Sequence, residues 1–156
     1  NAAERVGIPY LRLERAEWTP LPADNWISVP DTEAAVAALP PAARVLLTIG
    51  RKEIAGFLAR EDLSGVARMI EKPAFALPPN WPLVLARPPF SVEAERELLA
   101  FHKTTHLVTK NAGGKLTVAK LMAARAQRIP VVMIARPQKP PAPAYRSALA
   151  LVLALA

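Results

Sequence analysis

The first candidate for chemistry is a glycine followed by two cations, at a point where a buried strand is predicted to pass into a helix. Gly50, Arg51 and Lys52 directly follow the apolar run Val45–Ile49. A helix N-terminus offers free backbone N–H groups and a partial positive charge, which suit a phosphate, and the two cations add full charges. We therefore expect a phosphate-binding turn here. The alternative is an ordinary strand-to-helix turn with solvated cations.

A second strand-turn-helix pattern, at residues 109–117, carries more polar groups. Its two glycines, Gly113 and Gly114, allow a ligand to approach the backbone closely. The side chains that could bind such a ligand are Thr109, Asn111 and Thr117 by hydrogen bonds, and Lys110, Lys115 and Lys120 by charge. The pattern is neither a Walker A loop nor a G-x-G-x-x-G fingerprint. The alternative is a glycine-rich turn in which Thr117 is an ordinary helix cap.

Two arginines lie at equivalent positions, directly after a predicted strand. Arg87 and Arg136 each follow an apolar strand and each precede a proline. Arginine is suited to bidentate contacts with a carboxylate or phosphate. We expect both side chains to face a common crevice, with solvent-exposed surface arginines as the alternative.

Positive charge is concentrated in the last third of the chain. The 156 residues have a net charge of +7, but no acidic residue follows Glu97, whereas residues 98–156 carry nine Lys or Arg. This asymmetry favours an anionic partner: a phosphate, a polycarboxylate or a nucleic acid. Nucleic acid is the least favoured, because Phe101 and Tyr145 are the only aromatic residues there and cannot form a stacking platform.

Several kinds of chemistry lack their residues. The sequence has no cysteine and only two histidines, which argues against a thiol nucleophile and a histidine-rich metal site. Paired carboxylates and a Ser/His/Asp set do not stand out. The longest apolar run has nine residues, 148–156, and a bilayer span needs about 20. We therefore expect a soluble, cytoplasmic protein without a metal.

The elements that position these residues alternate between strand and helix. Strands are expected at residues 9–15, 26–29, 45–49, 66–70, 83–86, 106–109 and 131–135. Helices are expected at residues 31–39, 52–59, 91–101, 117–127 and 145–156, with Asp31 and Ser91 as N-terminal caps. Residues 1–7 are expected to be the end of a further helix, with Gly7 as its C-cap. This rhythm predicts an α/β fold with a mainly parallel sheet and helices on both faces.

Ligands of such sheets bind outside the carboxyl ends of the strands. Gly50, Arg87, Asn111 and Arg136 should therefore share one crevice. Ala94, Leu98 and Phe101 recur with helical spacing, which supports the helix expected after Ser91. The last apolar helix should pack on the sheet.

Several stretches together resemble the precorrin-6A reductase family of cobalamin biosynthesis. They are Thr109-Lys-Asn-Ala-Gly-Gly114, Pro9-Tyr-Leu-Arg-Leu-Glu-Arg15 followed by Trp18, Leu46-Leu-Thr-Ile-Gly-Arg51 and Ile129-Pro-Val-Val-Met-Ile-Ala-Arg-Pro137. The resemblance implies two Rossmann-like halves that face a cleft. The chain would cover roughly the carboxyl-terminal three-fifths, without the amino-terminal half and its Gly-Gly-Thr loop. Residues 1–29 would then be a connecting segment with strands from the end of that half, and residues 30–156 the carboxyl-terminal Rossmann-like domain.

The resemblance also implies an activity, namely the reduction of one double bond of a precorrin macrocycle with NADPH, giving precorrin-6B. On this interpretation Lys110 is the catalytic cation, and Arg87 and Arg136 hold substrate carboxylates. The cofactor would contact Gly50, Arg51, Lys52, Thr109, Asn111, Gly113 and Gly114. The sequence leaves open which loop takes which ligand, the proton donor, cobalt in the substrate, and the oligomeric state. The alternative function is a non-enzymatic α/β module that binds a phosphorylated or polycarboxylate ligand.

Overall fold

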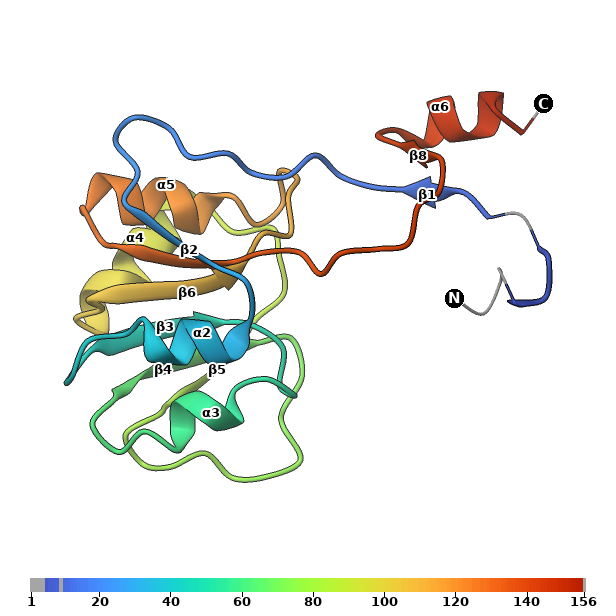
Figure 1. The fold of residues 1–156 in the computed structure, drawn as a ribbon. Helices are drawn as coiled ribbons and strands as arrows, with labels where there is room; N and C mark the ends of the chain where they lie inside the picture. The colour runs from blue at the N-terminus through green and yellow to red at the C-terminus, as the bar shows by residue number, and fades with distance from the viewer. Residues whose placement is uncertain (1–4, 9, 156) are drawn as a thin grey trace.

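A computed structural model describes residues 5–8 and 10–155, and its centre is a sheet of six parallel strands (Figure 1). The strands are β2 (Trp26–Val29), β3 (Arg44–Thr48), β4 (Ser64–Met69), β5 (Leu83–Leu85), β6 (His106–Lys110) and β7 (Val131–Ile134). The helices between them are α2 (Thr32–Ala37), α3 (Ala55–Leu58), α4 (Val92–Phe101) and α5 (Ala119–Ala126). Every neighbouring pair of these strands runs parallel, which confirms the predicted α/β fold.

The order of the strands creates a switch point in the middle of the sheet. In space the order is β2-β7-β6-β3-β4-β5. From β3 the chain moves outward to the edge strand β5, then returns to place β6 on the other side of β3. The loops after β3 and β6 therefore emerge side by side, with Thr48 in register with Thr109. Open parallel sheets bind ligands at such a point.

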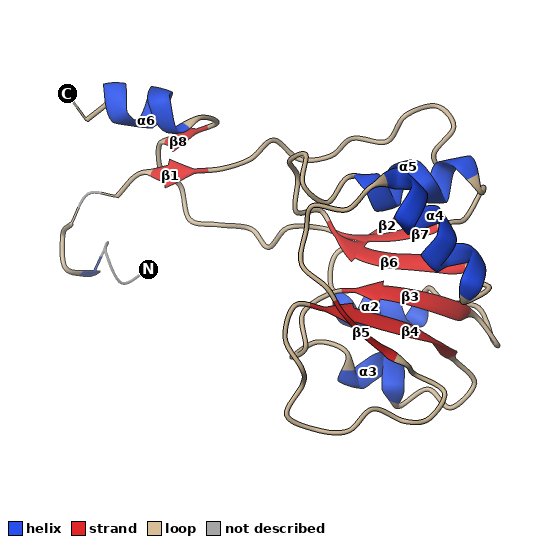
Figure 2. Ribbon diagram, turned by 180° about the vertical axis from the view of Figure 1, so that it is seen from behind, coloured by secondary structure: helices blue, strands red, loops and turns tan. Residues whose placement is uncertain are grey.

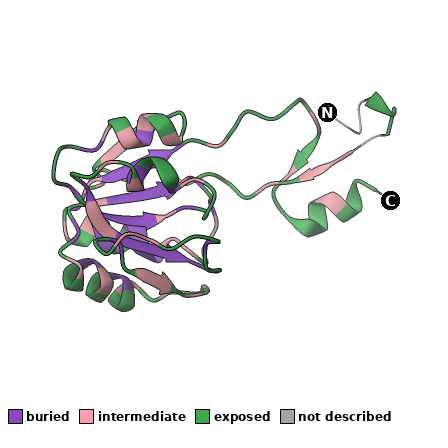
Figure 3. Ribbon diagram, turned by 90° about the horizontal axis from the view of Figure 1, so that it is seen from below, coloured by how far each residue is buried: buried purple, intermediate pink, exposed green. Residues whose placement is uncertain are grey.

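Helices cover both faces of the sheet (Figure 2). Ile54 and Phe57, beside and within α3, belong to one core with residues of α2, and Leu99 and Leu121 of α4 and α5 belong to a second core. The strands between the cores are the most buried part of the molecule (Figure 3). Side-chain caps fix the starts of two helices, because Asp31 accepts from the backbone N–H of Ala34, and Ser91 does the same for Ala94.

A small second unit extends away from this sheet (Figure 1). It consists of β1 (Arg12–Leu13), β8 (Ala144–Tyr145) and α6 (Ala148–Leu153), with β1 and β8 paired in parallel. The prediction that the last helix packs on the main sheet is therefore wrong: α6 contacts β1 and β8, and none of its residues is buried. The stiff, proline-rich residues 137–143 carry the chain away from the sheet before this helix begins.

The helix expected after Ser91 is present as α4, but its apolar residues at helical spacing are not its most buried ones. Phe101 is 82% exposed, whereas Glu95 and Leu99 are the buried residues of this helix. Glu95 is held inside by an ion pair with Arg68 on β4, so a charged residue belongs to the buried face of this helix. The helix is consequently rotated relative to its apolar periodicity.

Other boundaries differ more modestly. The helices expected at 52–59 and 117–127 begin later, at Ala55 and Ala119, because turns follow the preceding strands. Of the helix end expected at residues 1–7, residues 1–4 lie outside the described part, and Gly7 has the positive φ, 67°, of a helix C-cap. β2, which we expected in the connecting segment 1–29, is an edge strand of the main sheet. No helix in the described part of the chain combines the length and apolarity needed to cross a membrane.

Candidate active site

A cavity of about 440 Å³ opens at the carboxyl ends of β3 and β4. Its wall comes from the ends of these strands, the segment after β5 and the start of α5. Residues from these four places are Thr48, Arg68, Met69, Phe90, Thr117 and Lys120. Ile49, Ile70 and Pro88 make much of the remaining wall apolar. The cavity can therefore hold a mainly apolar ligand that carries negative charge at its edge.

Arg68 is fixed in the cavity wall by two contacts. Its Nη1 donates to Glu95 Oε1 at 2.7 Å, and its guanidinium carbon lies 4.1 Å from the centroid of the Phe90 ring. Both charged side chains are almost fully buried, with 7% and 1% exposed. Glu95 Oε2 is buried and has no hydrogen-bond partner in the part of the chain that the structure describes. One carboxylate oxygen of Glu95 is therefore hydrogen-bonded to Arg68, whereas the other is buried without a hydrogen bond from any described residue.

Lys120 is the second buried cation of this cavity. It is 5% exposed, and its Nζ lies 5.5 Å from the centroid of the Trp18 ring. Burial, and then the positive charge of Arg68, lower the pKa of Lys120 to about 8, while Glu95 opposes the shift. A perturbed titratable group in a cavity is a candidate for function.

The turn Gly50–Lys52 borders the cavity without forming a helix N-terminus. Gly50 and Arg51 line the cavity, but residues 50–53 form a turn, and the four-residue helix α3 begins only at Ala55. Arg51 pairs with Glu71 at 3.0 Å on the exposed surface. The part of the phosphate hypothesis that relied on a helix dipole is therefore wrong, and what remains is an exposed backbone turn with cations.

Lys110 joins the two loops of the switch point. It ends β6 and forms an ion pair with Glu53 in the loop after β3, and both side chains are partly exposed. Thr109, directly before it, is buried. Because Glu53 offsets the charge of Lys110, a substrate at this place would meet a lysine that is already paired.

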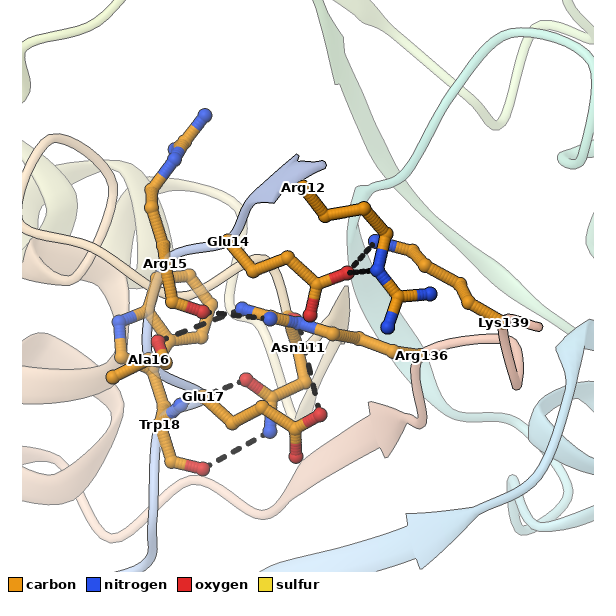
Figure 4. Close-up of polar contacts among 9 residues, drawn as sticks. All are labelled: Arg12, Glu14, Arg15, Ala16, Glu17, Trp18, Asn111, Arg136 and Lys139. Carbon is orange, nitrogen blue, oxygen red and sulfur yellow. Dashed lines mark hydrogen bonds and ion pairs between the residues drawn. The ribbon is translucent and has the colours of Figure 1, made fainter. Parts of the chain in front are cut away.

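The side chain of Asn111 binds the chain itself. Its Oδ1 accepts from the backbone N–H of Trp18 at 2.8 Å, and its Nδ2 donates to the carbonyl of Trp18 at 3.0 Å (Figure 4). The indole Nε1 of Trp18 donates to the carbonyl of Gly114 at 2.8 Å. Trp18 is thus held by the same turn that the sequence suggested for a cofactor, and its ring is placed beside Lys120.

Arg136 adds hydrogen bonds to the contacts that Asn111 and Gly114 make with Trp18. We call the contacts of residues 111–114 and Arg136 with residues 15–18 the clasp. Its Nε donates to the carbonyl of Asn111 at 2.6 Å and its Nη1 to the carbonyl of Arg15 at 2.7 Å, and Glu17 lies 3.8 Å from Nε (Figure 4). The donors of the guanidinium that were expected to bind substrate carboxylates are therefore directed at backbone carbonyls of residues 15 and 111.

Glycine is required at positions 113 and 114 because residues 15 and 16 lie close to the backbone there. Their φ angles are 66° and 80°. A Cβ on Gly113 would lie 2.1 Å from the carbonyl oxygen of Ala16, and a Cβ on Gly114 would lie 2.8 Å from Arg15 Cδ. The close backbone approach inferred from the two glycines is real, but its partner in the structure is the segment 15–18.

The expected single crevice is met only in part. Gly50 lines the cavity, and exposed Arg87 lies between two of its lining residues, Ala86 and Pro88. Asn111 and Arg136 belong to the clasp around residues 15–18. The residues assigned to one site thus fall into two neighbouring groups, which the Lys120–Trp18 contact connects.

Comparison with known proteins identifies the family. The family model described as "Precorrin-6x reductase CbiJ/CobK" matches residues 1–154. The chain belongs to the precorrin-6x reductase family. The precorrin-6A reductase of Rhodococcus erythropolis is 46% identical over 143 residues, which make up 91% of this chain and 58% of that relative. The precorrin-6A reductase of Rhodobacter capsulatus is 44% identical over 141 residues, 89% of this chain and 56% of that relative.

A solved structure of "CobK precorrin-6A reductase" has the same architecture. It superposes with a TM-score of 0.89 at 40% identity, over 99% of this chain and 62% of the solved chain. The present chain therefore spans between half and two thirds of the length of these relatives.

The sequence analysis did not identify the buried ion pair between Arg68 and Glu95 at the cavity. A signal was present, since Arg68 interrupts the apolar strand β4, and Glu95 lies one helical turn before buried Leu99. Charged residues at such positions are rarely fully buried unless they are paired. Lys120 was noted only as a source of charge, although it lies among buried Ala119 and Leu121.

Proposed function

We propose that this chain is the carboxyl-terminal part of a precorrin-6A reductase, which reduces one double bond of the precorrin macrocycle with NADPH. The observation that carries the proposal is membership of the family together with the cavity beside the switch point, whose wall is largely apolar and includes the cations Arg51, Arg68 and Lys120. A reductase needs no metal cluster or paired carboxylates in the protein, because the hydride comes from the nicotinamide. The protein then supplies orientation and electrostatics.

The proposed substrate is the tetrapyrrole precorrin-6A. Its macrocycle is largely apolar, and its acetate and propionate groups carry negative charge. The apolar wall with Met69 and Phe90 suits an edge of the ring, and Arg68 suits a carboxylate. Arg87, exposed beside the cavity, remains our candidate for a second carboxylate. For Arg136 the role in substrate binding remains a prediction that competes with its contacts to the backbone.

For NADPH, the turn Gly50–Lys52 fits better than the turn at residues 109–114. Gly50, Arg51 and Lys52 are exposed, with two cations beside the cavity, whereas Asn111, Gly113 and Gly114 are engaged by residues 15–18. We propose that the first turn contacts a phosphate of the cofactor. Direct cofactor contacts of Thr109, Asn111, Gly113 and Gly114 remain predictions, and their clasp gives them an indirect role in positioning Trp18.

Lys110 is proposed to stabilise negative charge that develops on the macrocycle during reduction. A fixed cation near the acceptor lowers the barrier, and one well-placed donor is typically worth about 3 kcal/mol. The ion pair with Glu53 holds Lys110 between the loops that follow β3 and β6. For this role Lys110 must exchange part of its contact with Glu53 for substrate.

The remaining proposals concern the whole protein. We propose that it acts in the cytoplasm, and that residues 1–29, which also add the edge strand β2 to the main sheet, connect the domain formed by residues 30–156 with an amino-terminal half. The exposed apolar residues of the β1, β8 and α6 unit, such as Leu13, Leu149 and Val152, support this proposal, because apolar side chains are stabilised by burial against another part of a protein.

The test is a paired assay of binding and turnover. The full-length protein is titrated with NADPH and then given precorrin-6A. We expect saturable NADPH binding, and NADPH oxidation that depends on precorrin-6A and yields a product reduced at one double bond. NADPH binding without turnover of the macrocycle would favour the alternative, a non-enzymatic α/β module that binds a phosphorylated or polycarboxylate ligand.

A further inference from the structure

One charged side chain of the described part of the chain, that of Lys120, is almost wholly buried beside the cavity. It lines the cavity, it is 5% exposed, and it makes no hydrogen bond to any residue that the structure describes. Its surroundings are the Trp18 ring, Arg68 on β4 and Glu95 on α4. Since Glu95 is hydrogen-bonded to Arg68, its charge is shared between two cations. A charged group buried without a full partner destabilises a fold, so a functional reason is needed.

Resting on the proposed function, we propose that Lys120 is the proton donor of the reduction. Two hydrogens must be added to the double bond. A bound reduced nicotinamide would supply one of them to one carbon as a hydride, with both electrons, and would itself be oxidised. The π electron pair of the double bond takes a proton from Nζ of Lys120, so that a C–H bond forms at the other carbon as an N–H bond breaks. Lys120 is left as a neutral amine, which solvent reprotonates.

The chemistry of Lys120 fits this step better than that of the other cavity residues. Burial, and then Arg68, lower its pKa to about 8, and general acids work best with a pKa near the operating pH. Arg68 is a guanidinium and does not lose its proton in proteins. Glu71 is exposed and paired with Arg51. The hydroxyls of Thr48 and Thr117 are too weakly acidic to protonate carbon.

The neighbours of Lys120 act as positioning residues. Arg68 is held between Glu95 and the Phe90 ring, so its charge is fixed near Lys120. Trp18 is held by Asn111 and Gly114 and covers the ammonium with its ring. The clasp around residues 15–18 therefore acts on the reaction by closing one side of the space around Lys120.

The decisive variants separate charge from acidity. Lys120→Arg keeps the positive charge but cannot donate a proton near neutral pH, and Lys120→Met removes both. We expect Lys120→Arg to lower kcat at least about 100-fold, as general acids typically contribute that much or more, while KM changes much less. Lys120→Met should lower kcat similarly. The matched control is Lys103→Met, at an exposed lysine that follows α4, and it should leave kcat unchanged.

A pH profile and a direct titration complete the test. In the wild-type enzyme kcat should fall as the pH rises through about 8, and this fall should disappear in Lys120→Met. Nuclear magnetic resonance of labelled lysines should show one lysine that titrates well below the others and is missing in Lys120→Met, whether or not substrate is present. Thermal unfolding of each variant shows that it is folded.

The outcomes are distinguishable. If the wild-type protein does not reduce precorrin-6A, the proposed function fails. If it does, while folded Lys120→Arg keeps near wild-type kcat, the proton-donor role is overturned and Lys120 is an anion-binding group. A lysine titration near the ordinary value at position 120 would overturn the inference as well.

Discussion

Substitution of Gly113 by alanine should destabilise the protein strongly, because two independent constraints act on this position. Its φ is 66°, in the left-handed region that L side chains avoid. An added Cβ would also lie 2.1 Å from the carbonyl oxygen of Ala16 and 2.4 Å from Arg136 Nη2. The segment that carries Ala16 must therefore move away from the turn.

The magnitude follows from what must be lost. The left-handed conformation costs alanine about 1 kcal/mol. If the segment moves, Arg136 loses its 2.7 Å hydrogen bond to the carbonyl of Arg15, and a bond from a charged donor contributes about 2 kcal/mol. We therefore expect Gly113→Ala to lower the free energy of unfolding by about 3 kcal/mol. At a urea dependence of about 1–3 kcal/mol per molar, the midpoint falls by about 1–3 M.

The assay is urea unfolding followed by tryptophan fluorescence, since Trp18 is part of the contact. The matched control is Gly50→Ala in the neighbouring loop. Gly50 has no positive φ, and its Cβ would meet Glu53 Oε2 at 3.5 Å, an ordinary contact. It should change stability by less than about 1 kcal/mol. Equal effects at both glycines would refute the argument that only the second turn is shaped by residues 15–18.

Three further predictions concern charged side chains. Glu95→Gln leaves the buried guanidinium of Arg68 without its counter-charge and should cost about 3–5 kcal/mol in chemical unfolding, whereas Arg68→Met combined with Glu95→Gln should cost less. The folded-state pKa of Lys120, about 8, lies below its ordinary 10.5, so the unfolded state binds more protons between these values. Stability measured by urea unfolding should therefore rise by up to about 3 kcal/mol from pH 8 to 10.5, and this rise should vanish in Lys120→Met. Lys110→Met should lower turnover at least about tenfold but change stability by less than about 1 kcal/mol, since its ion pair with Glu53 is partly exposed; equal losses would make Lys110 a structural residue.

The main sheet could be predicted because its signals are local. Apolar runs such as Val45–Ile49 and the turns after them lie within a few residues of each other, and β3 (Arg44–Thr48) differs from the prediction by one residue at each end. Asp31 and Ser91 were identified as helix caps for the same reason, since the backbone groups that they bind are three residues away.

The site was predicted less well because its partners are distant in sequence. Asn111 and Gly113 were correctly singled out as special, but their partners are Trp18 and Ala16, more than 90 residues earlier. Periodicity alone could not show that Glu95 is buried, because its partner Arg68 lies on another element. A ligand and a remote segment of the chain place similar demands on a glycine turn, so the sequence could not distinguish them.

The most direct test of the proposed reductase function follows the hydride itself. Full-length protein is given precorrin-6A and NADPH that carries deuterium at the transferable position of C4 of the nicotinamide, and the product is examined by nuclear magnetic resonance. We predict deuterium at a single ring carbon and a solvent-derived hydrogen at the neighbouring carbon. A reduced product with no deuterium at either carbon would contradict direct hydride transfer at this site.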